Sequence, residues 1–137
     1  MTSSKEIRIV NDLEEISRIQ EFIEELGNDL NLSSETIMNI NLALEEAVVN
    51  VIMYAYPEGE HHEILLKVTV NPQQLIFLLT DRGQSFDPTQ VPDTDIELSI
   101  EERGIGGLGI FLIRSIMNEV SYLRLKEENR LIMKKDL

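Results

Sequence analysis

The spacing of apolar and polar residues predicts two helices in the first half of the chain. Between residues 13 and 26 apolar positions recur every three or four residues and acidic residues occupy the other faces, which is typical of an amphipathic helix. Asn11 with Glu14 resembles a capping arrangement at its start, and Gly27 is a plausible stop. Ser33 is a suitable N-cap for a second helix, which we expect to continue to about Tyr56.

Alternating segments predict strands in the rest of the chain. They cover residues 6–10, 63–70, 75–80, 119–126 and 130–134. The turn residues 71–74 and 127–129 indicate two hairpins, and the apolar spacing of 110–117 predicts a third helix. A polar stretch from 81 to 103 is longer than most loops in compact domains and is typical of a lid or binding loop.

Polar residues interrupt the second predicted helix, which is apolar on nearly every side from Ile37 to Ala55 and so is expected to be buried. Asn39, Glu46 and Asn50 fall on one stripe of it. Glu46 and Asn50 are one turn apart, so their oxygens can converge on one hydrated Mg²⁺ ion. The alternative is a polar patch that satisfies itself or lies at a solvated edge.

Composition narrows the class of protein. The chain has 137 residues, 42% of them apolar, which matches one ordinary domain covering 1–137. It has no cysteine, no apolar leader at its start and no apolar run long enough to span a membrane, so we expect a soluble, cytoplasmic protein without a membrane partner. A formal charge of −13 repels phosphates and argues against DNA or RNA as a partner.

A glycine cluster precedes the third predicted helix. Gly104-Ile-Gly-Gly-Leu-Gly109 matches the dinucleotide motif G-x-G-x-x-G, but no hydrophobic strand comes before it, so that fold is not favoured. Glycines at a helix N-terminus can present backbone N–H groups to phosphate. A flexible loop followed by a helix start is the alternative.

Asp81-Arg-Gly-Gln-Ser-Phe-Asp-Pro88 follows a predicted strand directly. A carboxylate at a strand end can accept a hydrogen bond from an exocyclic amine such as adenine N6. The alternative is a common Asp-x-Gly turn.

Together, Glu46-x-x-x-Asn50, Asp81-x-Gly83, the long loop and Gly107-x-Gly109 resemble the ordered motifs of the GHKL ATPase superfamily. Residues 45–56, 81–88, 107–113 and 117–120 are most similar to the small anti-sigma-factor serine kinases of the RsbW and SpoIIAB type. The resemblance implies an α/β (α+β) two-layer sandwich of the Bergerat type, with a mixed, mostly antiparallel sheet and helices on one face.

The resemblance also implies ATP and Mg²⁺ as cofactors. Asn50 would bind Mg²⁺, Glu46 would orient or deprotonate the attacking hydroxyl, Asp81 would accept adenine N6–H, and Gly83 would let the base approach. Phosphate contacts would come from the glycine cluster, and Arg103 would reach the γ-phosphate; the cluster residues are Gly104, Gly106, Gly107, Leu108 and Gly109. Many relatives have Gly-Thr near the adenine where this chain has Asn129-Arg130-Leu131.

The implied activity is transfer of the γ-phosphate of ATP to a serine of an anti-sigma-factor antagonist by a protein that also sequesters a sigma factor. The first helix and first strand are the expected homodimer surface. The alternative is a switch protein of the same fold that binds its partner, with or without nucleotide, and transfers no phosphate.

Overall fold

The computed structural model describes residues 2–57, 59–90 and 109–137, which form two layers, a sheet and a set of helices. The sheet has the order β1-β2-β3-β5-β4 and every neighbouring pair is antiparallel. Its strands are β1 (Ser3–Val10), β2 (Glu63–Val70), β3 (Gln74–Asp81), β4 (Glu119–Leu125) and β5 (Glu128–Asp136).

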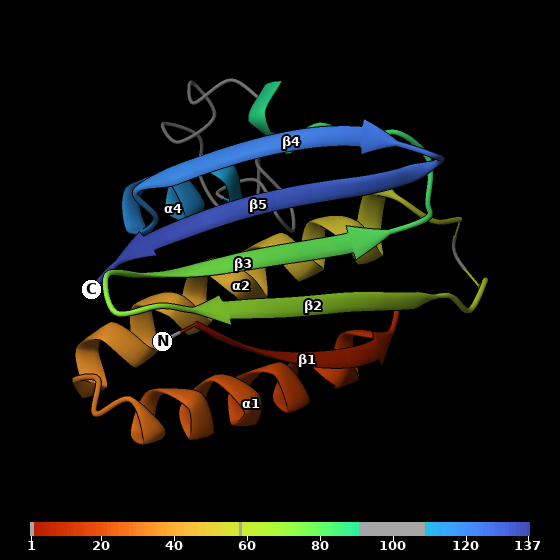
Figure 1. The fold of residues 1–137 in the computed structure, drawn as a ribbon. Helices are drawn as coiled ribbons and strands as arrows, with labels where there is room; N and C mark the ends of the chain where they lie inside the picture. Colours follow the sequence, from red (N-terminus) through yellow and green to blue (C-terminus); the bar gives the residue numbers. More distant parts are fainter. Residues whose placement is uncertain (1, 58, 91–108) are drawn as a thin grey trace.

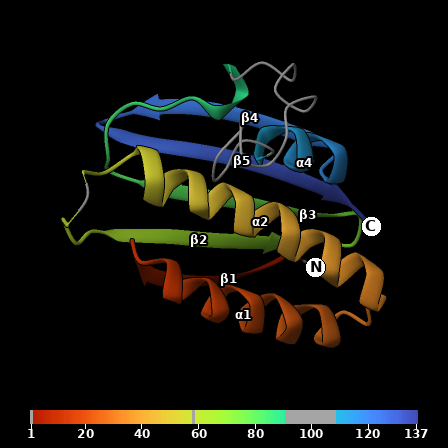
Figure 2. The same ribbon diagram turned by 180° about the vertical axis from the view of Figure 1, so that it is seen from behind.

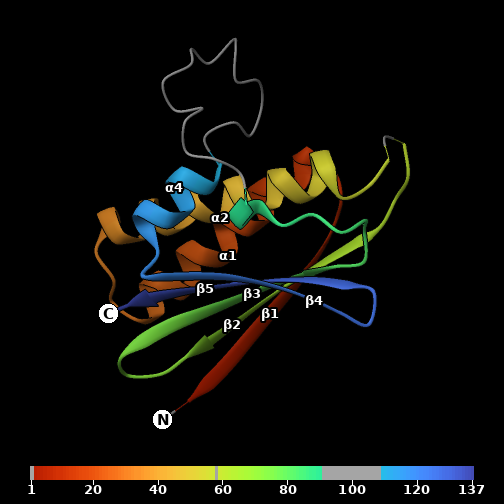
Figure 3. The same cartoon turned by 90° about the horizontal axis from the view of Figure 1, so that it is seen from above.

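Three helices cover one face of the sheet, and Figures 2 and 3 show them packed together on that side. They are α1 (Ile16–Asp29), α2 (Ser34–Tyr54) and α4 (Gly109–Ile116); short 3₁₀ turns, η1 (Leu13–Glu15) and η2 (Pro88–Gln90), complete the described elements. The core lies between the layers, where the inward residues of β2 and β3 meet α1 and α2. The predicted two-layer sandwich with helices on one face is confirmed, but its described strands are antiparallel throughout rather than mixed.

Helix α2 lies at the centre of the helical layer, as its all-round apolar sequence predicted. Ser33 caps it by accepting a hydrogen bond from the Thr36 backbone N–H at 3.1 Å. By length and hydropathy alone this helix could cross a membrane. Here eight of its residues are buried in the core, among them Ala43, Leu44 and Val48.

Two predictions about the first helix are wrong. The capping residue is Asp12, not Asn11, and it caps the 3₁₀ turn η1 that precedes α1, since the Asp12 carboxylate accepts from the Glu14 N–H at 3.0 Å; α1 itself has no side-chain cap. Helix α1 also continues past Gly27, which is buried. Gly27 packs closely against Ile37, since a β-carbon at residue 27 would lie 2.6 Å from the Ile37 Cδ1 atom. The chain turns instead at Asn31, whose φ is +56°.

The last hairpin is shifted relative to the prediction. Its turn lies at Lys126 and Glu127, which both have positive φ, rather than at 127–129. Asn129 therefore belongs to β5, where it is in register with Asp81, the last residue of β3. Because of this shift, Asn129, which the sequence assigned to a turn, lies in the sheet beside Asp81.

Candidate functional site

The site begins with Asn50 on the buried side of α2. Only 6% of Asn50 is exposed, and no hydrogen bond to its carboxamide is found among the described residues. Its carboxamide atoms are not fully enclosed, because the only enclosed side-chain polar atom without a partner among the described residues is Asn41 Oδ1. The donors and the acceptor of Asn50 therefore stay available to a ligand. Asn50 lines a small cavity together with Asp81.

Glu46 lies one turn before Asn50 and is partly buried. Burial and, second, the neighbouring carboxylate of Glu45 raise its pKa above the ordinary value. A carboxylate with a raised pKa is a better proton acceptor, which suits a group that takes a proton from a hydroxyl.

The N-terminus of α4 meets α2 at Asn50. A β-carbon on Gly109 would lie 2.7 Å from the Asn50 Nδ2 atom, so a larger residue at 109 would displace the Asn50 carboxamide from its present position. The free N–H groups of that turn are donors suited to phosphate. The structure therefore brings together Gly109 and Asn50, which are 59 positions apart in the sequence.

Asp81 and Gly83 lie just beyond the C-terminal end of α2, where Gly83 contacts Ala55. Asp81 is 4% exposed and its Oδ1 atom accepts a hydrogen bond from the Gly83 N–H at 2.9 Å. Burial raises the pKa of Asp81, although hydrogen bonds from Asn129 and Gly83 and the charge of Arg124 act in the opposite direction. Gly83 packs against Ala55, whose Cβ would be 2.6 Å from a β-carbon at residue 83.

Three residues that the sequence did not single out complete this end of the site. Asn129 donates from Nδ2 to Asp81 Oδ1 at 2.9 Å, and its Oδ1 accepts from the Tyr122 hydroxyl and from Arg124 Nη1. Arg124 also donates to the Gly83 carbonyl at 2.7 Å. The one sequence signal for this segment was that residues 129–131 differ from the Gly-Thr that many relatives have near the adenine.

The cavity between Asn50 and Asp81 is small. It measures about 20 Å³, enough for about one water molecule, whereas ligand pockets usually enclose some 300–1,000 Å³. Phe86, Pro88 and Tyr122 form much of its wall, and Phe86 stacks on Tyr54 with ring centroids 5.2 Å apart. A nucleoside can enter only when this wall shifts.

Part of the predicted site lies outside the described residues. Those predicted residues are Arg103, Gly104, Gly106, Gly107 and Leu108. Within the described ranges no group of three histidines or carboxylates could hold a metal ion. Mg²⁺ that arrives with a triphosphate needs only one or two protein oxygens, and the unpartnered Asn50 carboxamide meets that requirement.

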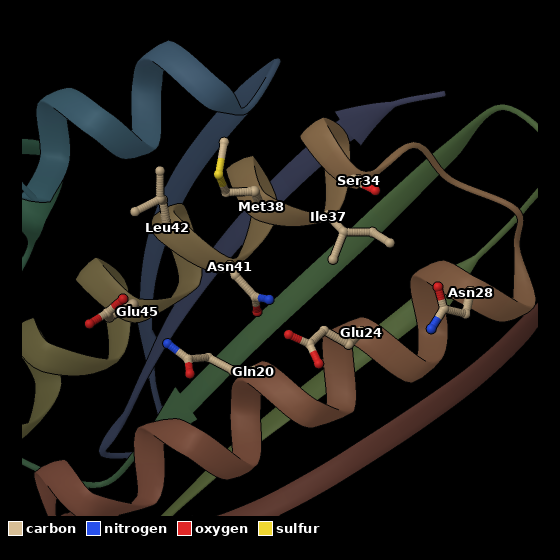
Figure 4. Close-up of a pocket in the computed structure, with 9 residues that line it drawn as sticks. All are labelled: Gln20, Glu24, Asn28, Ser34, Ile37, Met38, Asn41, Leu42 and Glu45. Carbon is tan, nitrogen blue, oxygen red and sulfur yellow. The ribbon is translucent and has the colours of Figure 1, made fainter.

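A larger groove, about 510 Å³ in volume, lies between α1 and α2 (Figure 4). Figure 4 shows Gln20, Glu24 and Asn41 directed into the space between the two helices. The groove contains none of the predicted site residues, and the nine residues that line it include two carboxylates and no lysine or arginine. A triphosphate would be repelled there, so this groove is a poor candidate for the nucleotide site.

Comparison with known families agrees with this geometry. Residues 9–135 match the model of the histidine kinase-like ATPase domain. The chain belongs to this family. The predicted relationship to GHKL ATPases is thereby confirmed.

Several relatives of this ATPase-family chain are named serine-protein kinase RsbW. The protein from Oceanobacillus iheyensis is 29% identical over 99 residues, which is 69% of this chain and 63% of the relative. The Listeria monocytogenes protein is 32% identical over 92 residues, or 64% and 59%. The Halalkalibacterium halodurans protein is 30% identical over 112 residues, or 79% and 66%. The chain thus matches about three-fifths of the length of the first two relatives.

Solved structures support the fold. A Mycobacterium tuberculosis structure containing RsbU and RsbW domains superposes with a TM-score of 0.69 at 12% identity, covering 97% of this chain and 32% of that one. A histidine kinase domain from Erythrobacter litoralis gives 0.55 at 16% identity, covering 91% and 60%. Both likenesses concern the fold alone.

Proposed function

We propose that this chain is an ATP-dependent protein-serine kinase that phosphorylates an anti-sigma-factor antagonist and also sequesters a sigma factor. The observation that carries the proposal is the buried Asn50 carboxamide, held against Gly109 at the start of α4 with Glu46 one turn away. The names of the relatives, serine-protein kinase RsbW, support the reaction type.

In the proposed site Asn50 holds Mg²⁺, which neutralises phosphate charge during transfer. Glu46 accepts the proton of the attacking serine hydroxyl, and the N–H groups of the α4 N-terminus contact the phosphates. Asp81 accepts a hydrogen bond from adenine N6, with Gly83 beside the base. Arg103 and the glycine cluster Gly104, Gly106, Gly107 and Leu108 remain proposed phosphate contacts.

We also propose a cytoplasmic homodimer that uses α1 and β1, with no nucleic acid or membrane partner. The net charge of −13 supports the exclusion of nucleic acid. The partners proposed are a sigma factor and its antagonist.

The test is incubation with Mg·ATP and the antagonist encoded near this chain's gene, followed by intact-mass measurement of the antagonist. We expect one phosphate on one serine, lost with Asn50→Ala and Glu46→Ala. If nucleotide binds and no phosphate moves, the second candidate holds: a non-catalytic switch of the same fold. A partly buried Glu46 favours the kinase, because a protein that only binds nucleotide has no use for a carboxylate there.

A further inference from the structure

Asn129 lies opposite Asp81 on two neighbouring strands, with both side chains on the face covered by helices. The pair is in antiparallel register, and each residue is 4% exposed. Directly opposite residues have β-carbons about 4.5–5.5 Å apart, close enough for their side chains to bond. The contact therefore follows from the register of β3 and β5.

Four hydrogen bonds fully occupy the Asn129 side chain. Its Nδ2 donates to Asp81 Oδ1 at 2.9 Å and to the Gln84 carbonyl at 2.8 Å. Its Oδ1 accepts from Arg124 Nη1 at 3.0 Å and from the Tyr122 hydroxyl. A carboxamide has two hydrogens and one oxygen with two lone pairs, so nothing remains for a ligand. These partners also fix its orientation, since the flipped amide would place its NH₂ group against the Arg124 donor and its oxygen against two acceptors, Asp81 Oδ1 and the Gln84 carbonyl.

The same network leaves Asp81 with one available oxygen. Its Oδ1 atom accepts from both Gly83 N–H and Asn129 Nδ2, whereas its Oδ2 atom has no hydrogen bond among the described residues. Arg124 ties the arrangement to the turn through the Gly83 carbonyl. The carboxylate therefore cannot rotate without losing two bonds.

We propose that Asn129 is a positioning residue that restricts base recognition to a single acceptor, Asp81 Oδ2. This inference rests on the proposed nucleotide site and deepens it. Asp81 Oδ2 accepts a hydrogen bond from the exocyclic amine of adenine. Asn129 has no free N–H to donate to ring nitrogen N1. The chain then distinguishes an amine from a carbonyl at position 6 of the purine, and is indifferent to N1.

Three nucleotides test this on the unmodified protein by calorimetry with Mg²⁺: ATP, inosine triphosphate and 1-deaza-ATP. Inosine triphosphate places a carbonyl against Asp81 Oδ2, so we expect it to bind at least tenfold more weakly than ATP. We expect 1-deaza-ATP, which lacks N1, to bind within about threefold of ATP. Tenfold weaker binding of 1-deaza-ATP, or equal binding of inosine triphosphate, would overturn the inference.

Two variants separate positioning from mere structural support. Asn129→Leu frees the Asp81 carboxyl group to rotate or to take up a proton and donate to a carbonyl. We therefore expect about tenfold weaker ATP binding and a smaller preference for ATP over inosine triphosphate. Lys134→Leu makes a polar-to-apolar change farther along β5, at a residue that pairs with Glu119 at 3.3 Å and does not line the cavity. It should keep both affinity and preference within about threefold.

An Asn129→Leu protein that keeps the ATP affinity and base preference of the parent would contradict the inference. If Asn129→Leu does not fold, the three-nucleotide comparison still decides. Failure of the parent protein to bind any purine triphosphate would instead overturn the proposed function itself. The two failures are therefore distinguishable.

Discussion

Glu46 and Asp81 are carboxylates in surroundings that oppose their negative charge. Burial raises the pKa of each, and Glu45 adds to the effect at Glu46. A carboxyl group whose pKa is higher in the folded than in the unfolded protein binds protons more tightly when folded. Stability then falls as pH rises through the interval between the two pKa values, which lies above the ordinary carboxyl range. Both residues therefore cost stability at neutral pH, as functional groups often do.

Glu46→Gln should be at least as stable as the parent at neutral pH and should lose about 10²–10⁴-fold of phosphoryl transfer, because the amide accepts no proton. Thermal unfolding and phosphate transfer to the antagonist measure the two effects. The matched control is Glu45→Gln, which removes the same charge from the adjacent residue. It should keep activity and move the acid limb of the pH profile to lower pH, since Glu45 raises the pKa of Glu46. Loss of activity in the control alone would contradict the assignment.

Asp81→Asn should also maintain or increase stability at neutral pH. The amide oxygen can accept the hydrogen bonds from Gly83 and Asn129, while the NH₂ group replaces the free oxygen. The NH₂ group of the new side chain then faces the adenine N6 amine, and both are donors. We therefore expect ATP binding to weaken about 10²-fold or more by calorimetry. Unchanged ATP affinity in a folded Asp81→Asn protein would show that the base is bound elsewhere.

At the scale of elements, the segment after β3 determines access to the site. Phe86 and Pro88 close the 20 Å³ cavity, and Arg114 of α4 donates to the Thr89 carbonyl, which ties this segment to α4. Entry of a nucleoside into so small a cavity requires this wall to shift. We expect this movement to limit the rate of nucleotide association.

Phe86→Ala should therefore increase the association rate of a fluorescent ATP analogue in stopped-flow measurements, while lowering stability by about 1–3 kcal/mol through lost packing. Leu123→Ala is the control, because Leu123 is 46% exposed and does not line the cavity. It should leave the association rate unchanged. Equal rates for Phe86→Ala and the parent would indicate that the wall does not govern entry.

The sequence predicted the elements well where a local signal determines them. The Ser33 cap, the buried α2 and the position of Asp81 at the end of a strand all follow from short-range chemistry. The prediction that the first helix ends at Gly27 was wrong, because the small size of Gly27 allows close packing against Ile37 and does not end the helix. The Asn129 contact was not predictable, since it depends on the register of β5 and on a turn formed by Lys126 and Glu127, which are unremarkable in composition.

At the scale of the molecule, we expect net charge to affect how the proposed antagonist is bound and released. The chain carries a net charge of −13, and phosphorylation adds about −1.5 to −2 to the antagonist serine. We expect the phosphorylated antagonist to bind more weakly than the unmodified form. The difference should shrink as salt rises, because surface charges beyond about 8–10 Å are screened near physiological ionic strength. Titration calorimetry at two salt concentrations measures this, and equal affinity of both forms at low salt would contradict it.

The most direct test of the account is calorimetric titration of ATP into the parent protein and into Asn50→Ala, each with Mg²⁺ and with EDTA. We expect saturable binding by the parent that weakens strongly in EDTA, and equally weak binding by Asn50→Ala under both conditions. Binding by the parent that is indifferent to Mg²⁺, or an Asn50→Ala protein that binds Mg·ATP as the parent does, would contradict the proposal that a buried amide on α2 holds the metal and the triphosphate.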